Sequence, residues 1–209
     1  MTIFLTIASF IAAMVVGFLM SLMRTSESRV LRFVSGTYVE YFRNTPLLVQ
    51  LFFWFFALPK LPTIDLPILG EITWLLSPLQ SALIGLSLYT GAYTTEALRS
   101  GLLAIDKGQT EAARALGLTY MQTRLYVVAP QAFRVAIPLL TSIFSALFRN
   151  SALASAIGVS ELLLTVDRIQ QQNFQTFELF TVAGILYLSL TLPLAWVSSR
   201  LERHVARAA

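Results

Sequence analysis

The residues of this sequence that could do chemistry are few. The 209-residue chain contains no cysteine and a single histidine, His204, in a basic C-terminal tail. Thiolate nucleophiles and cysteine-ligated metals are therefore excluded, and an enzyme would have little from which to build a nucleophile, a base or a metal cluster. The polar side chains that remain are suited to binding rather than to breaking bonds.

Two groups of polar and charged side chains interrupt long apolar runs. Glu96 and Arg99 end one run, and Arg149 and Asn150 end another that also carries Ser145. Charged residues inside apolar segments are costly, so they indicate function by default. Guanidinium and amide groups can donate to a carboxylate, and a carboxylate can accept from an ammonium, so the set is suited to a zwitterion. The candidate binding residues are Arg43, Thr45, Glu96, Ser145, Arg149, Asn150 and Ser151.

Simpler explanations exist for the same residues. Serine and threonine in membrane helices allow close packing, and we expect this to account for most of them. The long side chain of Arg149 can also reach from an apolar helix end to the interface. An amide at Asn150 favours zwitterions with neutral or acidic side chains, because a site for lysine or arginine would be expected to present a carboxylate.

Composition places these residues in a membrane protein. The chain is 56% hydrophobic and 12% charged, whereas about a quarter of the residues in ordinary globular domains are charged. Its net charge of +4 is attributed to membrane topology and not to nucleic acid binding. We predict an all-α fold with about five transmembrane helices, whose apolar parts lie at 2–23, 46–58, 79–97, 135–148 and 177–198.

The lengths of these segments differ. At about 1.5 Å per residue the first reaches about 33 Å, which is enough to cross the hydrocarbon core. The second is short, so its helix either extends into the amphipathic segment before it or crosses only part of the bilayer. The proline-rich segment 59–78, which contains Trp74, is predicted to be a loop lying along the interface.

Basic residues orient the five spans. Alternation of the loops leaves only Lys60, Arg149 and Arg168 of the 15 lysines and arginines on one face. The positive-inside rule then places the N-terminus outside and the C-terminus in the cytoplasm. Four or six spans would break this asymmetry, which is why we predict five.

A polar segment at 106–130, here called the elbow, separates the third and fourth spans. Asp106 with Gln109, and Thr119 with Gln122, have the spacing of capping boxes at two helix starts. The elbow is therefore predicted to be a pair of short helices exposed at the cytoplasmic surface.

Glycine and proline define the limits of the two helices. Gly117 is suited to the left-handed conformation that ends the first helix, and Pro130 is predicted to end the second. A capped connecting loop is the simplest alternative, but loops that only join helices commonly have about 2 to 8 residues. The length of this segment therefore favours a further role.

The elbow resembles the signature of permease subunits of ABC importers. It carries "EAA" at 111–113, Gly117 four residues after the last alanine, and "VVAP" at 127–130, where the family has Ile-x-Leu-Pro. Other stretches, including "FRNSALASAIGVSELL", resemble the polar amino acid uptake branch of that family, and the likeness covers most of the chain.

The resemblance implies an ABC type I importer permease fold, with residues 1–209 as a single transmembrane domain. Coupling helices at about 106–130 would dock into a separate ATPase. The implied coupling residues are Lys107, Gln109, Glu111, Ala112, Ala113, Ala115, Gly117, Leu118 and Thr119.

The resemblance also implies the setting of the protein. We expect a multi-pass subunit of the bacterial cytoplasmic (inner) membrane without enzymatic activity or a cofactor of its own. Its partners would be two ATPase subunits, a second permease that is identical or homologous, and an extracytoplasmic amino acid-binding protein. The sequence contains no GxxxxGK[ST] motif, so ATP and Mg²⁺ would be bound by the partner ATPase.

An ion-coupled secondary transporter or channel for small polar solutes is the alternative function. Such proteins favour inverted repeats and broken helices in matched positions. The sequence shows no convincing internal repeat, and five spans do not divide into equal halves.

Overall fold

The computed structural model describes residues 1–61, 64–66, 70–72 and 75–208. Helices make up nearly all of this part, so the predicted all-α class is confirmed. In chain order they are α1 (Thr2–Arg24), α2 (Arg29–Asn44), α3 (Leu47–Phe52), the π-helix η1 (Phe53–Ala57), the 3₁₀ turn η2 (Leu58–Lys60), α4 (Pro78–Leu103), α5 (Lys107–Ala115), α6 (Tyr120–Gln122), the π-helix η3 (Thr123–Val128), α7 (Ala129–Asn150), the 3₁₀-helix η4 (Ser151–Ile157), α8 (Leu162–Asn173) and α9 (Thr176–Ala208).

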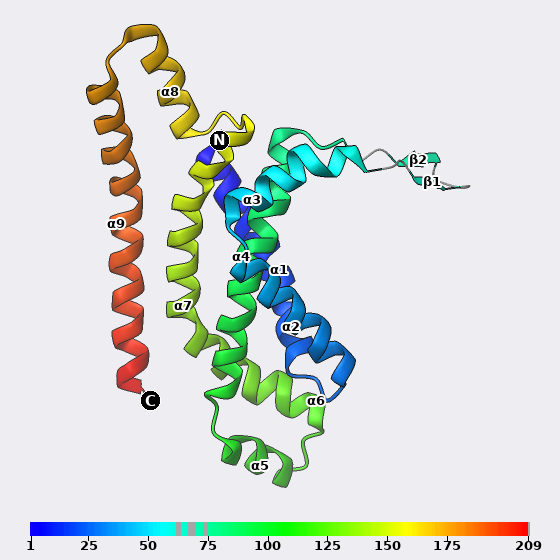
Figure 1. Cartoon of the computed structure of the whole chain (residues 1–209). Helices are drawn as coiled ribbons and strands as arrows, with labels where there is room; N and C mark the ends of the chain where they lie inside the picture. The colour runs from blue at the N-terminus through cyan, green and yellow to red at the C-terminus, as the bar shows by residue number, and fades with distance from the viewer. Residues whose placement is uncertain (62–63, 67–69, 73–74, 209) are drawn as a thin grey trace.

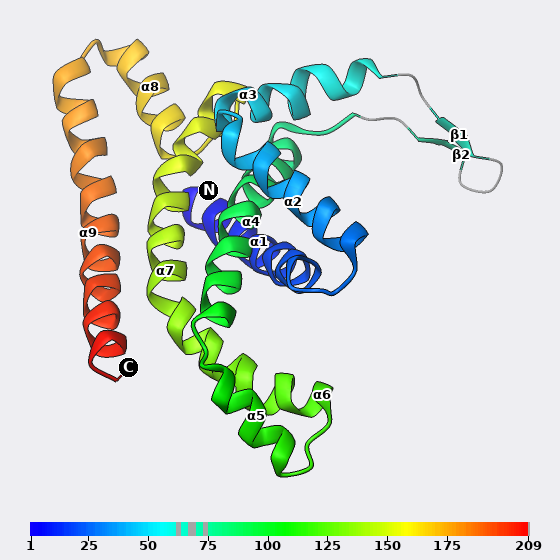
Figure 2. The ribbon, with the colours of Figure 1, turned by 60° about the horizontal axis from the view of Figure 1, so that its bottom comes forward.

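Four long helices form the body of the molecule. The central helix α4 packs against α1 and α7, and α9 packs against α7 (Figures 1 and 2). Within the described residues, three helical segments are long and apolar enough to cross a membrane: Thr2–Arg24, Tyr120–Ile157 and Thr176–Leu201. Helix α4 has 26 residues, a length of about 39 Å, but polar side chains reduce its hydropathy.

The two chain termini lie at opposite ends of this body. The N-terminus lies near α8, and the C-terminal end of α9 lies toward the end that carries α5 (Figure 1). A hydrogen bond from the backbone amide of Leu162 to Thr2 Oγ1, 2.9 Å long, fixes the start of α1 beside α8. Opposite termini are the arrangement that an odd number of crossings produces.

The second apolar block forms a short arm. Thr45 is extended (ψ 132) and separates α2 from α3, so the helix does not continue from the amphipathic segment. The helical arm Leu47–Lys60 reaches only about 21 Å, less than the hydrocarbon core of about 30 Å. The arm points away from the body of the molecule (Figure 1).

A small hairpin follows the arm, within the segment predicted to be a proline-rich loop. Strand β1 (Ile64–Leu66) pairs antiparallel with β2 (Gly70–Ile72). Trp74, assigned to the interface from the sequence, lies outside the described residues.

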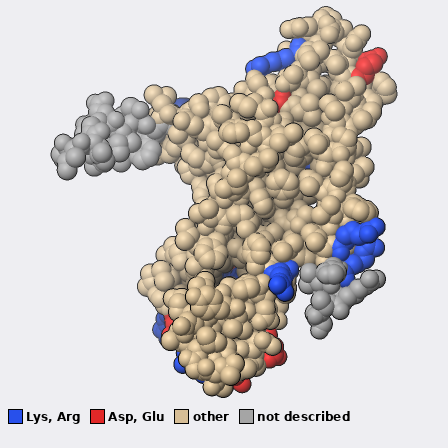
Figure 3. All heavy atoms as spheres, turned by 180° about the vertical axis from the view of Figure 1, so that it is seen from behind, with Lys and Arg blue, Asp and Glu red and all other residues tan. Residues whose placement is uncertain are grey.

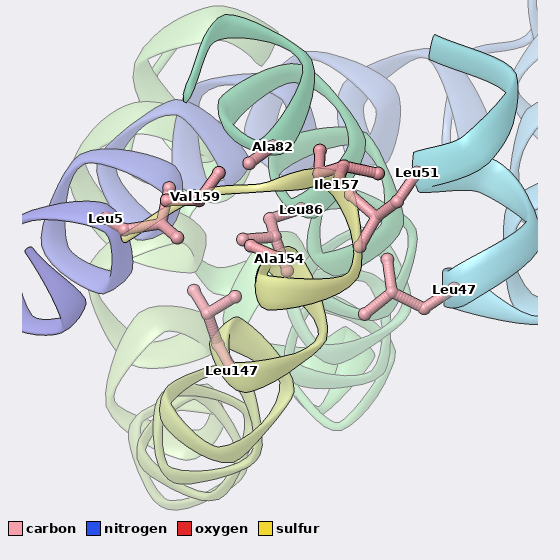
Figure 4. Packing of buried hydrophobic residues seen from close by; sticks show 9 residues of the cluster. All are labelled: Leu5, Leu47, Leu51, Ala82, Leu86, Leu147, Ala154, Ile157 and Val159. Carbon is pink, nitrogen blue, oxygen red and sulfur yellow. The ribbon is translucent and has the colours of Figure 1, made fainter. Parts of the chain in front are cut away.

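The main hydrophobic cluster joins α1, α3, α4, α7 and η4 near the N-terminal end of α1 (Figure 4). Leu5, Leu51 and Leu86 are fully buried in it. Helix association in a bilayer depends mainly on van der Waals packing, because lipid tails are as apolar as leucine. The cluster therefore fixes the positions of the helices by shape.

Small residues bring α1 and α4 close together. A β-carbon on Gly17 would collide with the side chain of Thr94. Thr94 Oγ1 donates to the carbonyl oxygens of Ala13 on α1 and Gly91 on α4, each at 2.9 Å. This is the packing that the sequence predicts for small and hydroxylated residues.

Charged side chains gather toward the two ends of the molecule. On the face shown in Figure 3, lysine, arginine and acidic residues cluster near the upper and lower ends, and a mostly uncharged belt separates them. Such a belt is the surface that a bilayer requires, because charges at membrane depth are costly.

Candidate functional site

The first helix of the elbow begins at Asp106. Its Oδ1 accepts a hydrogen bond from the backbone amide of Gly108 at 2.6 Å. The prediction of a reciprocal capping box with Gln109 is wrong: the Gln109 side chain instead accepts a long, 3.5 Å bond from Gln131 Nε2 on α7. The carboxylate accepts from the amide two residues along the chain, as in an Asx turn, whereas the amide of Gln109 donates to the backbone carbonyl of Asp106 and not to its side chain.

A left-handed turn joins the two halves of the elbow. Gly117 has φ 84, and its amide donates to Arg114 O at 3.0 Å, while the amide of Leu118 donates to Ala113 O at 3.2 Å. These bonds satisfy carbonyls at the end of α5 in the manner of a Schellman motif. The prediction that Gly117 ends the first helix in a left-handed conformation is confirmed.

The second half begins with the capping box that the sequence predicts. The backbone amide of Gln122 donates to Thr119 Oγ1 at 3.3 Å, and the backbone amide of Thr119 donates to Gln122 Oε1 at 2.9 Å. Two amide groups at the helix start are therefore satisfied by side chains.

The prediction that Pro130 ends this helix is wrong. One helical segment runs from Tyr120 to Ile157, 38 residues. Pro130 lies in the first turn of α7, immediately after the π-helix η3, whose wider hydrogen-bond spacing changes the register of the backbone bonds. Proline is tolerated in the first turn of an α-helix, and the α-helical spacing begins only at Ala129.

The predicted coupling residues lie on an exposed surface. Helix α5 packs against η3, and Ala113 is the residue of α5 that is buried. Leu118 is partly buried, and the other seven predicted coupling residues are exposed. The structure therefore presents most of the "EAA" segment outward.

Five exposed large apolar residues of the elbow, including Leu116 and Met121, were not among the coupling residues predicted. Leu116 is 84% exposed and Met121 is 70% exposed, one on each side of the Gly117 turn. Apolar side chains exposed within a polar segment indicate a binding surface. The position of Leu116 and Met121 at a predicted turn was the sequence signal that could have identified them.

A polar face of α4 lies on the side away from its small-residue packing. Tyr89, Tyr93 and Glu96 follow helical spacing along it, and the two tyrosine hydroxyls are 3.2 Å apart. The guanidinium of Arg43 lies 5.2 Å from the centre of the Tyr93 ring, within the range of a cation–π contact. Arg43 and Glu96 are among the binding residues predicted from the sequence, whereas neither tyrosine is.

Glu96 is the acidic centre of this face. Its Oε2 lies 2.7 Å from Arg99 Nη2, and its Oε1 lies 3.5 Å from Arg24 Nε on α1. The charge of Arg43 also acts on this carboxylate. Three arginines around one glutamate leave an excess of positive charge suited to an anionic group.

Hydroxyl groups on the opposite side of α4 are buried. Ser87, Thr90, Thr94 and Thr95 are each no more than 7% exposed. The packing explanation given for such residues is therefore the one that the structure supports.

A second polar group lies at the end of α7. Arg149 Nη1 donates to Ser145 Oγ at 3.1 Å. Asn150 is the last residue of α7 and is partly exposed, whereas Ser151 is fully buried and donates to Phe148 O at 2.7 Å. Arg149, Ser145 and Asn150 therefore remain the candidates for binding here, with the hydroxyl of Ser151 bonded locally.

The two polar groups are separate in this chain. Of the hydrogen bonds, ion pairs and cation–π contacts within residues 1–61 and 75–208, none joins Arg43 or Glu96 to Arg149. Thr45 belongs to neither, because its hydroxyl donates to Tyr41 O at 2.7 Å and completes the end of α2.

Glu161 is a buried acid that the sequence analysis did not single out. Its side chain is 1% exposed, its Oε1 accepts from the amide of Leu164 at 2.8 Å, and its Oε2 accepts from the hydroxyl of Tyr187 at 2.8 Å. It therefore caps α8 and joins α8 to α9.

Comparison with known proteins identifies the family. Residues 6–207 match the family described as binding-protein-dependent transport system inner membrane component. This chain belongs to that family. As an inner membrane component of a transport system, it is an integral membrane transport subunit and not an enzyme, and membership decides against an ion-coupled secondary transporter or channel.

Individual relatives align with almost the whole of this chain. The L-cystine transport system permease protein TcyB of Bacillus subtilis (strain 168) is 39% identical over 207 residues, 99% of this chain and 84% of its own length. The glutamate/aspartate import permease protein GltJ of Escherichia coli (strain K12) is 34% identical over 206 residues, 98% of this chain and 84% of its own length.

Solved structures agree with the fold. The crystal structure of an amino acid ABC transporter with histidines is 30% identical and superposes with a TM-score of 0.84 over 98% of this chain and 90% of that chain. The inward-facing MetNI methionine ABC transporter, 21% identical with a TM-score of 0.71 over 98% of this chain and 90% of that chain, shares the fold. The ABC importer permease fold is therefore confirmed.

Proposed function

We propose that this chain forms the translocation pathway of an ATP-driven importer of polar amino acids and couples it to separate ATPase subunits. The observation that carries the proposal is the elbow: an outward-facing helix, α5, fixed by a left-handed turn at one end of the helical body. Two short, exposed helices held by a hydrogen-bonded turn at one end of the helical body are suited to docking into another protein.

The assembly proposed contains two permeases and two ATPase subunits. One chain supplies polar residues of α4 and α7 on only one side of the translocation pathway. A second permease, identical or homologous, supplies the opposite side. ATP and Mg²⁺ are bound by the ATPases, and an extracytoplasmic binding protein delivers the amino acid. The family description, which specifies dependence on a binding protein, supports this arrangement.

The proposed orientation places the elbow and the C-terminus in the cytoplasm and the N-terminus outside. The distribution of arginine and lysine supports it, as does the separation of the two termini (Figure 1). In this orientation the Arg149 end of α7 faces the outer side and receives the amino acid first, whereas Glu96 lies toward the cytoplasmic side.

Neutral or acidic amino acids are the proposed substrates. Arg149 and Ser145 supply donors for a carboxylate, and Asn150 supplies an uncharged amide. Similar proteins carry the names of permeases for L-cystine, glutamine and glutamate/aspartate, which supports this class.

Transport by the reconstituted assembly tests the proposal. Proteoliposomes containing the permease, its partner permease and its ATPase are loaded with ATP, supplied with binding protein outside, and assayed with labelled glutamate, glutamine, cystine and arginine. We expect ATP-dependent uptake of the first three above arginine. Uptake that persists without any ATPase subunit would contradict the proposed mechanism.

A charge reversal tests the elbow separately. Glu111 is exposed on α5, so Glu111→Lys is expected to prevent co-purification of the ATPase and to leave membrane insertion intact. Glu178→Lys makes the same change at an exposed position near the opposite end of the body and should retain the ATPase. Equal co-purification with both variants would contradict coupling through α5.

A further inference from the structure

An apolar groove lies between the end of α1 and the second half of the elbow. It has a volume of about 880 Å³, within the roughly 300–1,000 Å³ of small-molecule sites in proteins. Its walls come from α1, the start of α2, α4, α6, η3 and α7. Representative lining residues are Phe18, Leu22, Leu98, Leu102, Leu125 and Phe133.

The groove is continuous with the outer surface of α1. Phe18 and Leu22 line the groove and are 54% and 42% exposed. They continue a line of exposed apolar residues along the same helix that includes Ile11 and Val15. This line lies on a helix long and apolar enough to span the membrane, so a lipid chain can enter the groove sideways from the bilayer.

The rim of the groove carries arginines without acidic partners. Arg124 lines the groove, and its guanidinium stacks on Tyr120 at 4.8 Å from the ring centre. Arg32 Nη1 donates to the carbonyls of Ser26 and Glu27, both lining residues, at 2.7 and 2.8 Å. The ion pairs among the described residues use Arg24, Arg99 and Glu96, so neither rim arginine is neutralised by a carboxylate.

One acidic side chain, Glu27, also lines the groove. Two guanidinium groups against one carboxylate leave the rim with net positive charge. Basic pockets between transmembrane helices at the membrane surface are suited to phosphate-bearing lipid headgroups. Guanidinium groups also bind phosphate with good geometry.

We propose that this groove binds one anionic phospholipid, with an acyl chain between α1 and α7 and its phosphate at Arg124 and Arg32. Tyr120, Met121, Arg124 and Leu125 belong to the elbow, so the bound lipid packs directly against the segment that docks the ATPase. The site is distinct from the polar faces of α4 and α7, and it does not depend on which amino acid is transported.

Native mass spectrometry of the full-length chain in a mild detergent tests the proposal. The protein is titrated with dioleoylphosphatidylglycerol or with dioleoylphosphatidylcholine, and the lipids retained per chain are counted. We expect one tightly retained phosphatidylglycerol and weaker retention of phosphatidylcholine. Arg124→Gln and Arg32→Gln should each lower phosphatidylglycerol affinity about fivefold, from the attraction of one basic residue for an anionic lipid surface.

Three further variants distinguish recognition of the headgroup, occupation of the groove by a lipid chain and a general effect of positive charge. Glu27→Gln should raise phosphatidylglycerol affinity, because it removes the opposing charge. Arg134→Gln, at an exposed arginine of α7 that does not line the groove, should leave it unchanged. Ala129→Trp, at a lining position, should block retention of both lipids by filling the groove.

Two outcomes would overturn the proposal. Equal retention of both lipids, unaffected by Arg124→Gln and Arg32→Gln, would show that the rim does not select an anionic headgroup. A dimer of this chain that Ala129→Trp dissociates, without any change in lipid retention, would show that a second copy occupies the groove.

Discussion

Gly117 and Gly158 allow the role of the elbow to be tested with a matched pair of substitutions. Both have left-handed backbones, with φ 84 and φ 87, and at both positions a β-carbon would have no neighbour within 4 Å. Alanine at either site therefore adds backbone strain without a steric clash. The cost of the left-handed conformation for alanine is about 1–2 kcal/mol, the same at both sites.

The consequences differ because the two turns lie in different places. Gly117 sets the direction of α5 relative to α6, whereas Gly158 lies between η4 and α8, near the N-terminus of the chain. If docking requires the native turn, Gly117→Ala should weaken binding of the ATPase about 5- to 30-fold, the factor that corresponds to 1–2 kcal/mol. Gly158→Ala should lower thermal stability similarly and leave ATPase affinity unchanged.

Titration of the solubilised permease with its labelled ATPase measures the affinity, and thermal unfolding in the same detergent measures the common strain. Gly117→Asn is an internal check, because asparagine tolerates the left-handed region better than alanine and should recover part of the affinity. A role of the Gly117 turn in docking would be refuted if Gly117→Ala binds the ATPase as tightly as the unmodified chain, or if Gly158→Ala weakens binding equally.

Three further predictions concern packing and specificity. Gly17→Ala, which forces a β-carbon into Thr94, should destabilise the α1–α4 contact by about 1–3 kcal/mol, measured by thermal unfolding, whereas Gly184→Ala, with open space around its β-carbon, should not. Tyr187→Phe removes the 2.8 Å bond to buried Glu161 and should cost about 1–3 kcal/mol; the same loss in Tyr126→Phe, at an exposed tyrosine, would argue against that bond. Asn150→Glu should let arginine compete for uptake, because it adds a carboxylate at the proposed site; Asn173→Glu, at an exposed helix end, is the control, and unchanged competition by arginine, glutamine and glutamate would contradict the specificity assignment.

Local chemistry made parts of the fold predictable. Gly117 and the Thr119–Gln122 box depend on residues within a few positions of each other, and both are found as expected. The prediction for Pro130 is wrong because the rule that proline ends a helix considers only α-helical hydrogen bonds, and the π-helical turn before Pro130 changes their spacing.

Contacts between different helices could not be predicted from the sequence, and the candidate site depends on them. The contact of Tyr93 with Arg43 depends on the position of a different helix, α2, which places the guanidinium over the tyrosine ring. Glu161 meets Tyr187, a residue on a different helix, and nothing in the local sequence specifies that pairing. Several hydroxyl residues of α4 are buried, as expected for packing, but the sequence did not distinguish this buried face of α4 from its polar face.

The continuous helix from Tyr120 to Ile157 has a geometric consequence for any force applied at the elbow. Its 38 residues extend over about 57 Å, so a tilt of about 5° at one end moves the other end by about 5 Å. Arg149 lies about 44 Å along this helix from Tyr120, so the same small rotation at the proposed ATPase-docking end would displace it by about 4 Å, roughly one carbon–carbon contact distance. Such amplification requires a stiff helix, and bending at η3, at Pro130 beside it or at Pro138 would reduce the displacement.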